Sequence, residues 1–431
     1  MNRLIIAIIG ILVCCSCSKK DDIEPIPEPV VQHTVLVYMS GENNLTKDSR
    51  YPNESYLADD LEEMKEGSYL LSKDQRLIAF IDSVGTNNYP HIVEIANGKA
   101  TEVYRYDKEF YASDPQKFRE IVKWTMDNYP SEDYALVLWG HATGWAVSND
   151  TIASARKYTR AYGQDKGWDN SSNSSNSERW MNITQMAKAL EGLPKFKYIF
   201  ADCCCFMCVE SAYELRNVAD YLIGSPAEIP GEGGPYHILL PKLFSQSTTF
   251  YKDICDTYYD YFMEAYQMPP YIDNSSNSYF IGYSLPLSAI DLSKMDNLAQ
   301  ATNQVLKSFA TSYPEELDLS YLPFYFGLDY PVMYDMKSVI QKYAPSLDYS
   351  QWISAYNKAV VYSLVSQRWM TIYSKIKNKY YTFPSDESVY GCVSMFFPQN
   401  NYDSSDSKFE YNTRIKNYQW YYAVDWSNYG W

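Results

Sequence analysis

The chain has 431 residues, of which 46% are hydrophobic and 21% are charged. This balance predicts a folded protein of two or three domains and excludes a disordered, collagen-like or polytopic membrane chain. The 53 acidic residues outnumber the 37 basic ones and give a formal net charge of −16, so the surface repels phosphate backbones and nucleic acid is not an expected partner.

Residues 1–17 have the pattern of a secretion signal. Arg3 supplies a positive charge, residues 4–13 are almost entirely apolar, and small residues lead to Cys17. The apolar run is too short for a membrane span, which needs about 20 residues. The segment resembles the bacterial lipoprotein signal, in which Cys17 becomes the lipidated residue. An ordinary signal peptide or an apolar N-terminal helix is the alternative.

The lipoprotein resemblance implies an extracytoplasmic protein, periplasmic or on the cell surface, that a lipid anchors to a membrane, with the outer membrane preferred. Residues 18–32 contain Pro25, Pro27 and Pro29 and are expected to form an extended linker from the anchor to the fold.

From residue 33 onward, apolar strands alternate with helices. Strands are expected at 34–39, 77–81, 134–139, 197–201 and 288–292, with a hairpin over 91–106 that turns at Asn97-Gly98. Helices are expected from the Asp114-Pro115 cap, over 183–190, over 209–218 and over 295–309. This alternation predicts an α/β domain over residues 33–292, with a mostly parallel sheet and helices on both faces.

Two segments interrupt or follow this pattern. Residues 147–179 are polar and include a Ser/Asn run, so we expect an exposed, flexible loop there. Residues 293–431 form a Tyr-rich C-terminal region, expected to be α+β, with a strand at 392–397.

The chain has only four histidines. His141 directly follows an apolar strand, and open α/β sheets bind their ligands at the carboxyl ends of strands. His33 would lie at the opposite edge, His91 in the hairpin and His237 in a loop. A solvated or structural imidazole is the better interpretation for those three.

Four thiols follow another strand, in the run Asp202-Cys203-Cys204-Cys205-Phe206-Met207-Cys208. A thiol at a strand-to-helix junction lies near a positive helix end, which favours the thiolate. If the strands that lead to His141 and Cys204 are adjacent and parallel, both side chains face one crevice. That arrangement suits a Cys/His nucleophile and base.

Other interpretations of the thiols remain open. A zinc or iron–sulfur site needs a second ligand pair, and only the isolated Cys255 and Cys392 are left, so no metal is expected there. Taken singly, Cys203, Cys205 and Cys208 fit buried core cysteines. A disulfide within the cluster has unfavourable geometry, and a redox role for Cys205 and Cys208 lacks the thioredoxin-like context.

Together these segments resemble the clostripain family of cysteine peptidases. Family members have a His-Gly-x-Gly-Trp segment, matched by residues 141–145, and an Asp-Ala-Cys segment followed by Glu and an Ala-Tyr-Glu-Leu helix, matched by residues 202–215. The spacing from Asp202 to Glu210 puts the nucleophile at Cys204. Residues 36–45, 221–231 and 288–293 also resemble the family.

The resemblance implies a caspase-like fold and a Cys/His dyad in which the Cys204 thiolate attacks the scissile carbonyl and His141 acts as general base and acid. The backbone N–H groups of Cys204 and Ala142 would hold the oxyanion. Ala142 stands where the family usually has Gly, and Cys203 where it usually has Ala.

Asp202 matches the family acid that selects Arg or Lys before the cut bond, although a helix N-cap is an equal alternative on sequence alone. Glu228 and Glu232 are candidate supporting acids, more simply interpreted as solvated loop charges.

The family resemblance also suggests self-processing after a basic residue of the loop. The candidates are Arg156, Lys157, Arg160, Lys166 and Arg179. The chemistry requires no cofactor, and the resemblance allows calcium. The expected function is a secreted, lipid-anchored endopeptidase that cleaves proteins or peptides after Arg or Lys. The alternative is a catalytically silent lipoprotein of the same fold that binds peptide or glycan through exposed Tyr and Trp of the C-terminal region.

Overall fold

The structure is a computed structural model. It describes residues 31–47, 53–85, 88–146, 161–167, 178–265, 285–309, 317–365, 389–404 and 409–431, together with Trp369 and Thr371. The expected signal segment, Cys17 and residues 18–30 of the linker lie outside the described residues, as do Arg156, Lys157 and Arg160. Residues Val31–Trp431 form one compact unit.

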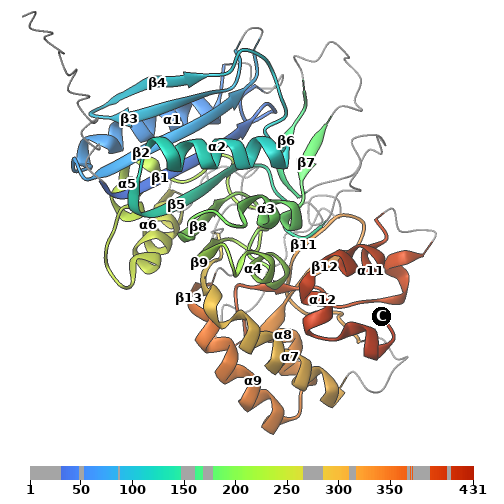
Figure 1. Cartoon of the computed structure of the whole chain (residues 1–431). Coiled ribbons are helices and arrows are strands. Elements are labelled where there is room, and N and C mark those ends of the chain that lie inside the picture. Colours follow the sequence, from blue (N-terminus) through green and yellow to red (C-terminus); the bar gives the residue numbers. More distant parts are fainter. Residues whose placement is uncertain are drawn as a thin grey trace, which may run out of the picture. The chain divides into compact units, whose positions relative to one another are not determined.

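A central sheet runs through this unit (Figure 1). In its described part it has nine strands, ordered β13-β10-β9-β8-β5-β1-β2-β3-β4. The strands are β1 (Val31–Gly41), β2 (Gln75–Ser83), β3 (His91–Ala96), β4 (Lys99–Arg105), β5 (Ser131–Gly140), β8 (Phe196–Asp202), β9 (Ala219–Gly224), β10 (Leu287–Asp291) and β13 (Val360–Leu364). The five central strands are mutually parallel, and an antiparallel pair continues the sheet on each side.

Both faces of the sheet are covered, as the continuous apolar strands predict. Alternate residues of each strand belong to two separate cores: Leu36 and Tyr38 of β1 face one, and Val35 and Val37 face the other. The first core includes α2 (Pro115–Asn128), α3 (Ile183–Leu190) and α4 (Val209–Leu215). The second includes α1 (Tyr56–Gly67), α5 (Tyr236–Leu243) and α6 (Phe250–Ala265) (Figure 1). The predicted α/β sheet is confirmed.

Local signals in the sequence locate several elements well. Asp114 caps α2 through Oδ1, which accepts from the N–H groups of Gln116 and Lys117, and Pro115 occupies the first turn. The hairpin of β3 and β4 turns at Asn97-Gly98, where both residues have positive φ. His33 lies at the start of β1, at the edge of the sheet opposite to the end of the strand, as expected.

Four expectations about elements are wrong in detail. The helix after the thiol cluster ends at Leu215, so Val218 lies beyond it. The strand expected at 392–397 is only β14 (Ser394–Met395), because the Phe396 N–H donates to the Glu210 side chain instead of to a neighbouring strand. His237 lies in α5 and not in a loop, with Nδ1 3.2 Å from Glu63 Oε2.

The fourth correction concerns the segment 147–179, which was expected to be an exposed loop throughout. Its described parts include β6 (Tyr162–Asp165) and the first residue of β7 (Arg179–Met181), and these two strands form a two-stranded sheet. Tyr162 and Asp165 are fully buried, and the Tyr162 hydroxyl donates to the carbonyls of Tyr38 and Trp139. The ribbon of β6 and β7 is therefore packed against the ends of β1 and β5 and is not a surface loop.

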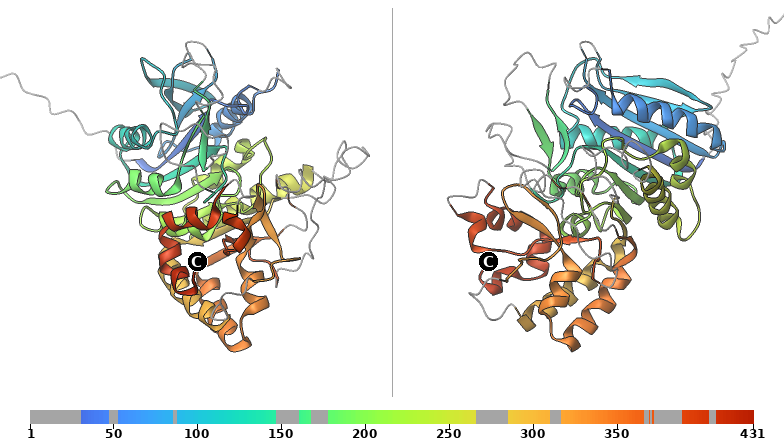
Figure 2. Two further views of the ribbon diagram at one scale, coloured as in Figure 1. Left: turned by 90° about the vertical axis from the view of Figure 1, so that its right-hand side faces the viewer. Right: turned by 180° about the vertical axis from the view of Figure 1, so that it is seen from behind.

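The Tyr-rich C-terminal region is continuous with the rest of the fold, because its strand β13 pairs with β10 in the central sheet. A small sheet of β11 (Phe324–Gly327), β12 (Pro331–Asp335) and β14 lies in this region, with helices α7 (Met295–Phe309), α8 (Met336–Tyr343), α9 (Ser346–Ala359), α11 (Tyr411–Arg414) and α12 (Gln419–Ala423). Figure 2 shows α7 and α9 side by side. None of the helices in the described part of the chain is both long and apolar enough to span a lipid bilayer.

Candidate active site

Adjacent parallel strands bring His141 and the thiol cluster to the same edge of the sheet. Trp139 of β5 and Asp202 of β8 are register partners, and both strands end there or one residue later. His141 and Cys204 each come two residues after these partners, at the carboxyl ends where α/β sheets place their ligand sites. Both side chains are partly exposed, although their surroundings are mostly buried.

The His141 ring is oriented by Asn44, which lies just beyond the end of β1. Nε2 of His141 is 3.0 Å from Oδ1 of Asn44. Because an amide oxygen can only accept, Nε2 carries the proton in this contact, and Nδ1 is then the basic nitrogen of the neutral ring. Asn44 belongs to a segment that resembles the family, but no role was predicted for it. No local pattern identifies it, because the contact joins residues 97 positions apart.

Cys204 differs from its neighbours in exposure. It is partly exposed, whereas Cys203, Cys205 and Cys208 are fully buried. Its Sγ lies 3.4 Å from the backbone nitrogen of Ile229, whose N–H donates to the sulfur. A donated hydrogen bond stabilises a thiolate more than a thiol. Among the cysteines that the structure describes, only Cys204 is partly exposed, and it follows the strand next to the one that leads to His141.

The buried thiols are expected to be poor nucleophiles, because burial disfavours the thiolate. Burial raises the pKa of Cys203 and Cys205 well above the ordinary value and that of Cys208 to about 12. The residue at the N-cap of α4 is Cys208, and Cys204 lies four residues before it. The thiol at the helix end is therefore Cys208, where desolvation dominates, and activation of Cys204 by that helix end stays a prediction.

Asp202 lies on the other face of the sheet from Cys203, at the end of β8. It is not a helix N-cap, so that alternative is wrong. Its Oδ2 accepts from the N–H of Gly234 at 2.9 Å and from the hydroxyl of Tyr236 at 2.6 Å, and Oδ1 accepts from the hydroxyl of Tyr258 at 2.8 Å. These donors come from segments far along the chain and could not be recognised from the sequence.

A second buried acid accompanies Asp202. Asp60 of α1 accepts a hydrogen bond from Trp139 Nε1. Burial raises the pKa of both carboxyl groups, and the negative charge of Asp202 raises that of Asp60 further. Within the described residues, neither forms an ion pair with Lys or Arg. The two carboxyl groups thus make a buried acidic site, and Asp202 directly precedes Cys203 in the chain.

The segment after His141 is held by β6. The N–H of Gly163 donates to the carbonyl of His141, and the N–H of Thr143 donates to the carbonyl of Ala161. Ala142 and Tyr162 are opposite each other in an antiparallel bridge, and both hydrogen bonds of this bridge are formed by the residues on either side of Ala142, not by Ala142 itself. The Ala142 N–H therefore points away from β6, as an oxyanion donor must.

The other residues singled out from the sequence are the candidate supporting acids and the candidate processing sites, and most of them are less favourably placed for these roles. Glu232 is exposed, whereas Glu228 is half-buried and precedes Ile229, which donates to Cys204. Lys166 directly follows β6, and Arg179 begins β7 with its guanidinium 3.8 Å from the centre of the Tyr111 ring. Both belong to or adjoin the packed ribbon, which makes them poorer processing sites than an extended loop.

Comparisons with known proteins identify the family and the fold of this chain. A family model described as the clostripain family matches residues 37–431. The chain is similar to a secreted C11 cysteine protease from Bacteroides thetaiotaomicron in complex with an irreversible peptide inhibitor, with 26% identity and a TM-score of 0.71 over 92% of this chain and 99% of that one. A search of the curated proteins finds no significant match.

A second solved structure supports the fold alone. It is an inactive zymogen C11 protease from Parabacteroides distasonis, with 23% identity and a TM-score of 0.71 over 92% of this chain and 98% of that one. The predicted caspase-like α/β fold is confirmed. The family match covers nearly all of the described residues, and the chain therefore belongs to the clostripain family of cysteine peptidases.

Proposed function

We propose that this peptidase is a secreted, lipid-anchored endopeptidase that cuts after Arg or Lys with Cys204 as nucleophile and His141 as general base and acid. One observation carries the dyad: the partly exposed cysteine of the cluster and His141 follow adjacent parallel strands, whereas His91, which lies at the same edge of the described sheet, is three strands away from β5 at the start of β3.

The dyad suggests the following sequence of events. Nδ1 of His141 takes the thiol proton, the Cys204 thiolate attacks the scissile carbonyl, and the ring then protonates the leaving amine. The N–H groups of Cys204 and Ala142 stabilise the oxyanion. Water releases the thioester with the same histidine as base.

The preference for Arg or Lys rests on the buried acids. Asp202 and Asp60 have raised pKa values and no cationic partner among the described residues. A guanidinium or ammonium group of the substrate would supply the missing charge, and a planar guanidinium can bind a carboxylate through two hydrogen bonds. The half-buried Glu228 adds negative charge on the side of Ile229.

Lipid attachment at Cys17 and processing after Arg156, Lys157 or Arg160 remain proposals from sequence. The silent lipoprotein alternative is weaker, because most of the aromatic residues on which it depends are buried: Trp352, Trp369, Trp420 and Trp426 are all at most 2% exposed, although Tyr321 and Tyr422 are exposed. Calcium binding likewise remains a proposal from the family resemblance.

The test compares two neighbouring cysteines with fluorogenic peptides in reducing buffer. Cys204→Ala should lower kcat/KM by about 10³-fold or more, because it removes the nucleophile. Cys203→Ala is the matched control: it makes the same change in a buried thiol at the adjacent position and should keep activity within about tenfold.

Peptides with Arg, Lys or an uncharged residue before the cut bond test the specificity. Cleavage of the two basic peptides at least a hundredfold faster than the uncharged one supports the proposal. Residual activity in Cys204→Ala, or a wild type that cleaves none of the peptides, contradicts it. Mass mapping after labelling with a basic chloromethylketone should find the adduct on Cys204.

A further inference from the structure

The C-terminal region contacts the turn that carries the nucleophile. This nucleophile turn, residues 203–208, leads from β8 to α4. The N–H of Met207 donates to the carbonyl of Ser225 at 3.0 Å, and the carbonyl of Met207 accepts from the N–H of Ser394 at 3.1 Å. Ser394 belongs to β14 and forms a parallel bridge with Cys208. The nucleophile turn therefore lies between the segment that follows β9 and a strand of the C-terminal region.

The helix after this turn, α4, is also bound to the C-terminal region. The side chain of Glu210 accepts from the N–H of Phe396 at 2.8 Å, and that of Glu214 accepts from the backbone and side-chain nitrogens of Gln419 at 2.5 and 2.9 Å. Both carboxyl groups are buried, and a buried polar group that loses its hydrogen-bond partners destabilises the fold. These contacts therefore hold α4, and with it the end of the nucleophile turn, in one position.

The histidine segment, residues 141–145, reaches the same part of the C-terminal region. The ring of Trp145 packs edge-on against the ring of Phe396, with 4.7 Å between the ring centres and 63° between the ring planes. Both side chains are fully buried, and aromatic pairs favour this geometry. Phe396 comes two residues after Ser394. Three consecutive residues, 394–396, therefore contact both segments of the dyad.

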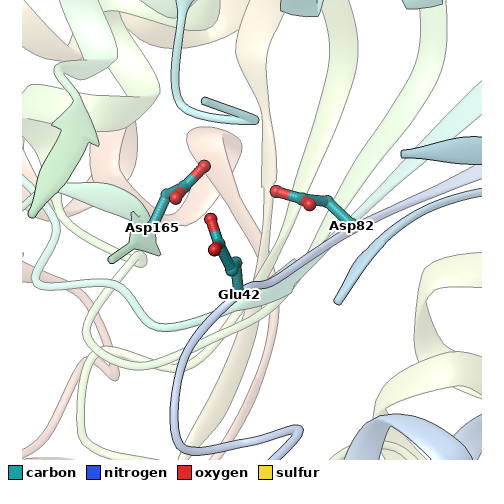
Figure 3. Close-up of side chains that lie close together, drawn as sticks. All are labelled: Glu42, Asp82 and Asp165. Carbon is teal, nitrogen blue, oxygen red and sulfur yellow. The ribbon is translucent and has the colours of Figure 1, made fainter. Parts of the chain in front are cut away.

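The opposite side of the histidine segment is held by β6, which belongs with the first half of the sheet. β6 ends at Asp165, whose carboxylate points toward those of Glu42 and Asp82 (Figure 3). One oxygen of each lies within 4.8 Å of the others, and all three residues are buried. Asp82 lies in β2, and Glu42 directly follows β1. The β6 side of the histidine segment thus depends on β1 and β2, whereas its Trp145 end depends on residues 394–396.

We propose that residues 394–396 are a positioning element for the dyad, which makes the C-terminal region part of the catalytic machinery. The inference rests on the proposed pair of Cys204 and His141. Their side chains must meet in a fixed geometry, and a misplacement of about 1 Å costs about a hundredfold in rate. All three residues of the element are fully buried, so they act through the nucleophile turn and the histidine segment and not on the substrate.

The test compares two adjacent buried phenylalanines in the full-length chain. Phe396→Leu removes the ring that contacts Trp145. Phe397→Leu is the matched control, because Phe397 is equally buried and its ring packs against Trp426 within the C-terminal region. Both variants lose the same volume from the core, so both should lower Tm. Phe396→Met, whose flexible side chain adapts to an irregular space, is used if the leucine variant does not fold.

The first readout needs no substrate. It is the rate at which iodoacetamide alkylates Cys204 at pH 7, followed by mass mapping, with His141→Ala as the reference for a thiol without its base. The wild type should react about tenfold faster than His141→Ala or more, because a neighbouring imidazole favours the thiolate. Phe396→Leu should fall toward the His141→Ala rate, and Phe397→Leu should keep the wild-type rate.

The second readout is steady-state cleavage of the fluorogenic peptides. Phe396→Leu should lower kcat about ten- to a hundredfold at nearly constant KM, whereas Phe397→Leu should stay within about threefold of the wild type. Trp145→Leu should resemble Phe396→Leu. Since both changes remove one contact, the double variant should be no more than about threefold slower than the slower single variant.

Equal values for Phe396→Leu and Phe397→Leu in both readouts would overturn the proposal, because any loss would then reflect stability alone. Losses that multiply in the double variant would also contradict it, since the two rings would then act separately. Failure of the dyad has a different signature: the wild type and His141→Ala would be alkylated at the same rate, and the positioning role would fall with the dyad.

Discussion

Glu210 is predicted to make this protein less stable as the pH rises toward neutrality. The residue lies in α4 and is fully buried, and its Oε1 accepts from the Phe396 N–H at 2.8 Å, which joins α4 to the C-terminal region. Burial raises its pKa from the ordinary 4.5 to about 7. Between these two values the folded protein keeps a proton that the unfolded chain has released.

The sign and size follow from this difference in proton binding. When the folded state binds more protons, the free energy of unfolding falls as the pH rises. A pKa of about 7 against 4.5 corresponds to about 3 kcal/mol, which is fully present below pH 4.5 and lost as the pH passes through 7. Glu210→Gln cannot ionise and keeps an oxygen that can accept from Phe396, so it should not lose this contribution.

The assay is urea denaturation of the full-length chain at pH 5, 6, 7 and 8, with Cys204→Ala in every protein to prevent self-cleavage. The free energy of unfolding of Glu210→Gln, relative to the parent, should rise by about 2.5 kcal/mol over this range, because part of the contribution is already lost at pH 5. Glu132→Gln, on an exposed residue of β5, is the matched control and should show a constant difference. A constant difference for Glu210→Gln as well would refute the assigned burial effect.

Of two further predictions, one concerns the positioning of the dyad and the other the stability of the turn after His141. Asn44→Ala should lower kcat/KM about ten- to a hundredfold at nearly constant KM and Tm, because the His141 ring loses the acceptor at 3.0 Å that fixes its tautomer. Asn44→Asp should recover part of the loss. An unchanged kcat in Asn44→Ala would remove Asn44 from the mechanism. Gly144→Ala should lower the free energy of unfolding in denaturant by about 1–3 kcal/mol, because Gly144 has a φ of +56° and an added Cβ would lie 2.3 Å from the Cys205 carbonyl oxygen. A variant as stable as the wild type would show that this turn can relax.

The sequence predicted the parts of the site that depend on local pattern. Continuous apolar runs identify β5 and β8, and a residue two positions past each run must lie at the carboxyl edge. That reasoning placed His141 and Cys204 together in space once the strands were taken as neighbours, and the structure pairs Trp139 with Asp202 as this requires.

The contacts that complete the site could not be predicted in this way, because they join segments with no shared pattern. The donors to Asp202 come from Tyr236 and Tyr258, which are 34 and 56 residues away. The strand β6 was missed because Tyr162–Asp165 is short and contains a glycine, and its burial comes from packing against β1 and β5, not from its own periodicity. Asp165 was missed as a partner of Glu42 and Asp82 for the same reason.

The order of strands in the sheet has a consequence for any chain cut between residues 147 and 160. Strands β1 to β5 would belong to the first fragment and β8 to β13 to the second, yet β5 and β8 are hydrogen-bonded neighbours at the centre. The histidine and the nucleophile would reside on separate polypeptides, and each piece alone would expose a long apolar strand edge. A nicked molecule should therefore migrate as two bands after denaturation and elute as one particle in native buffer, with neither half active by itself.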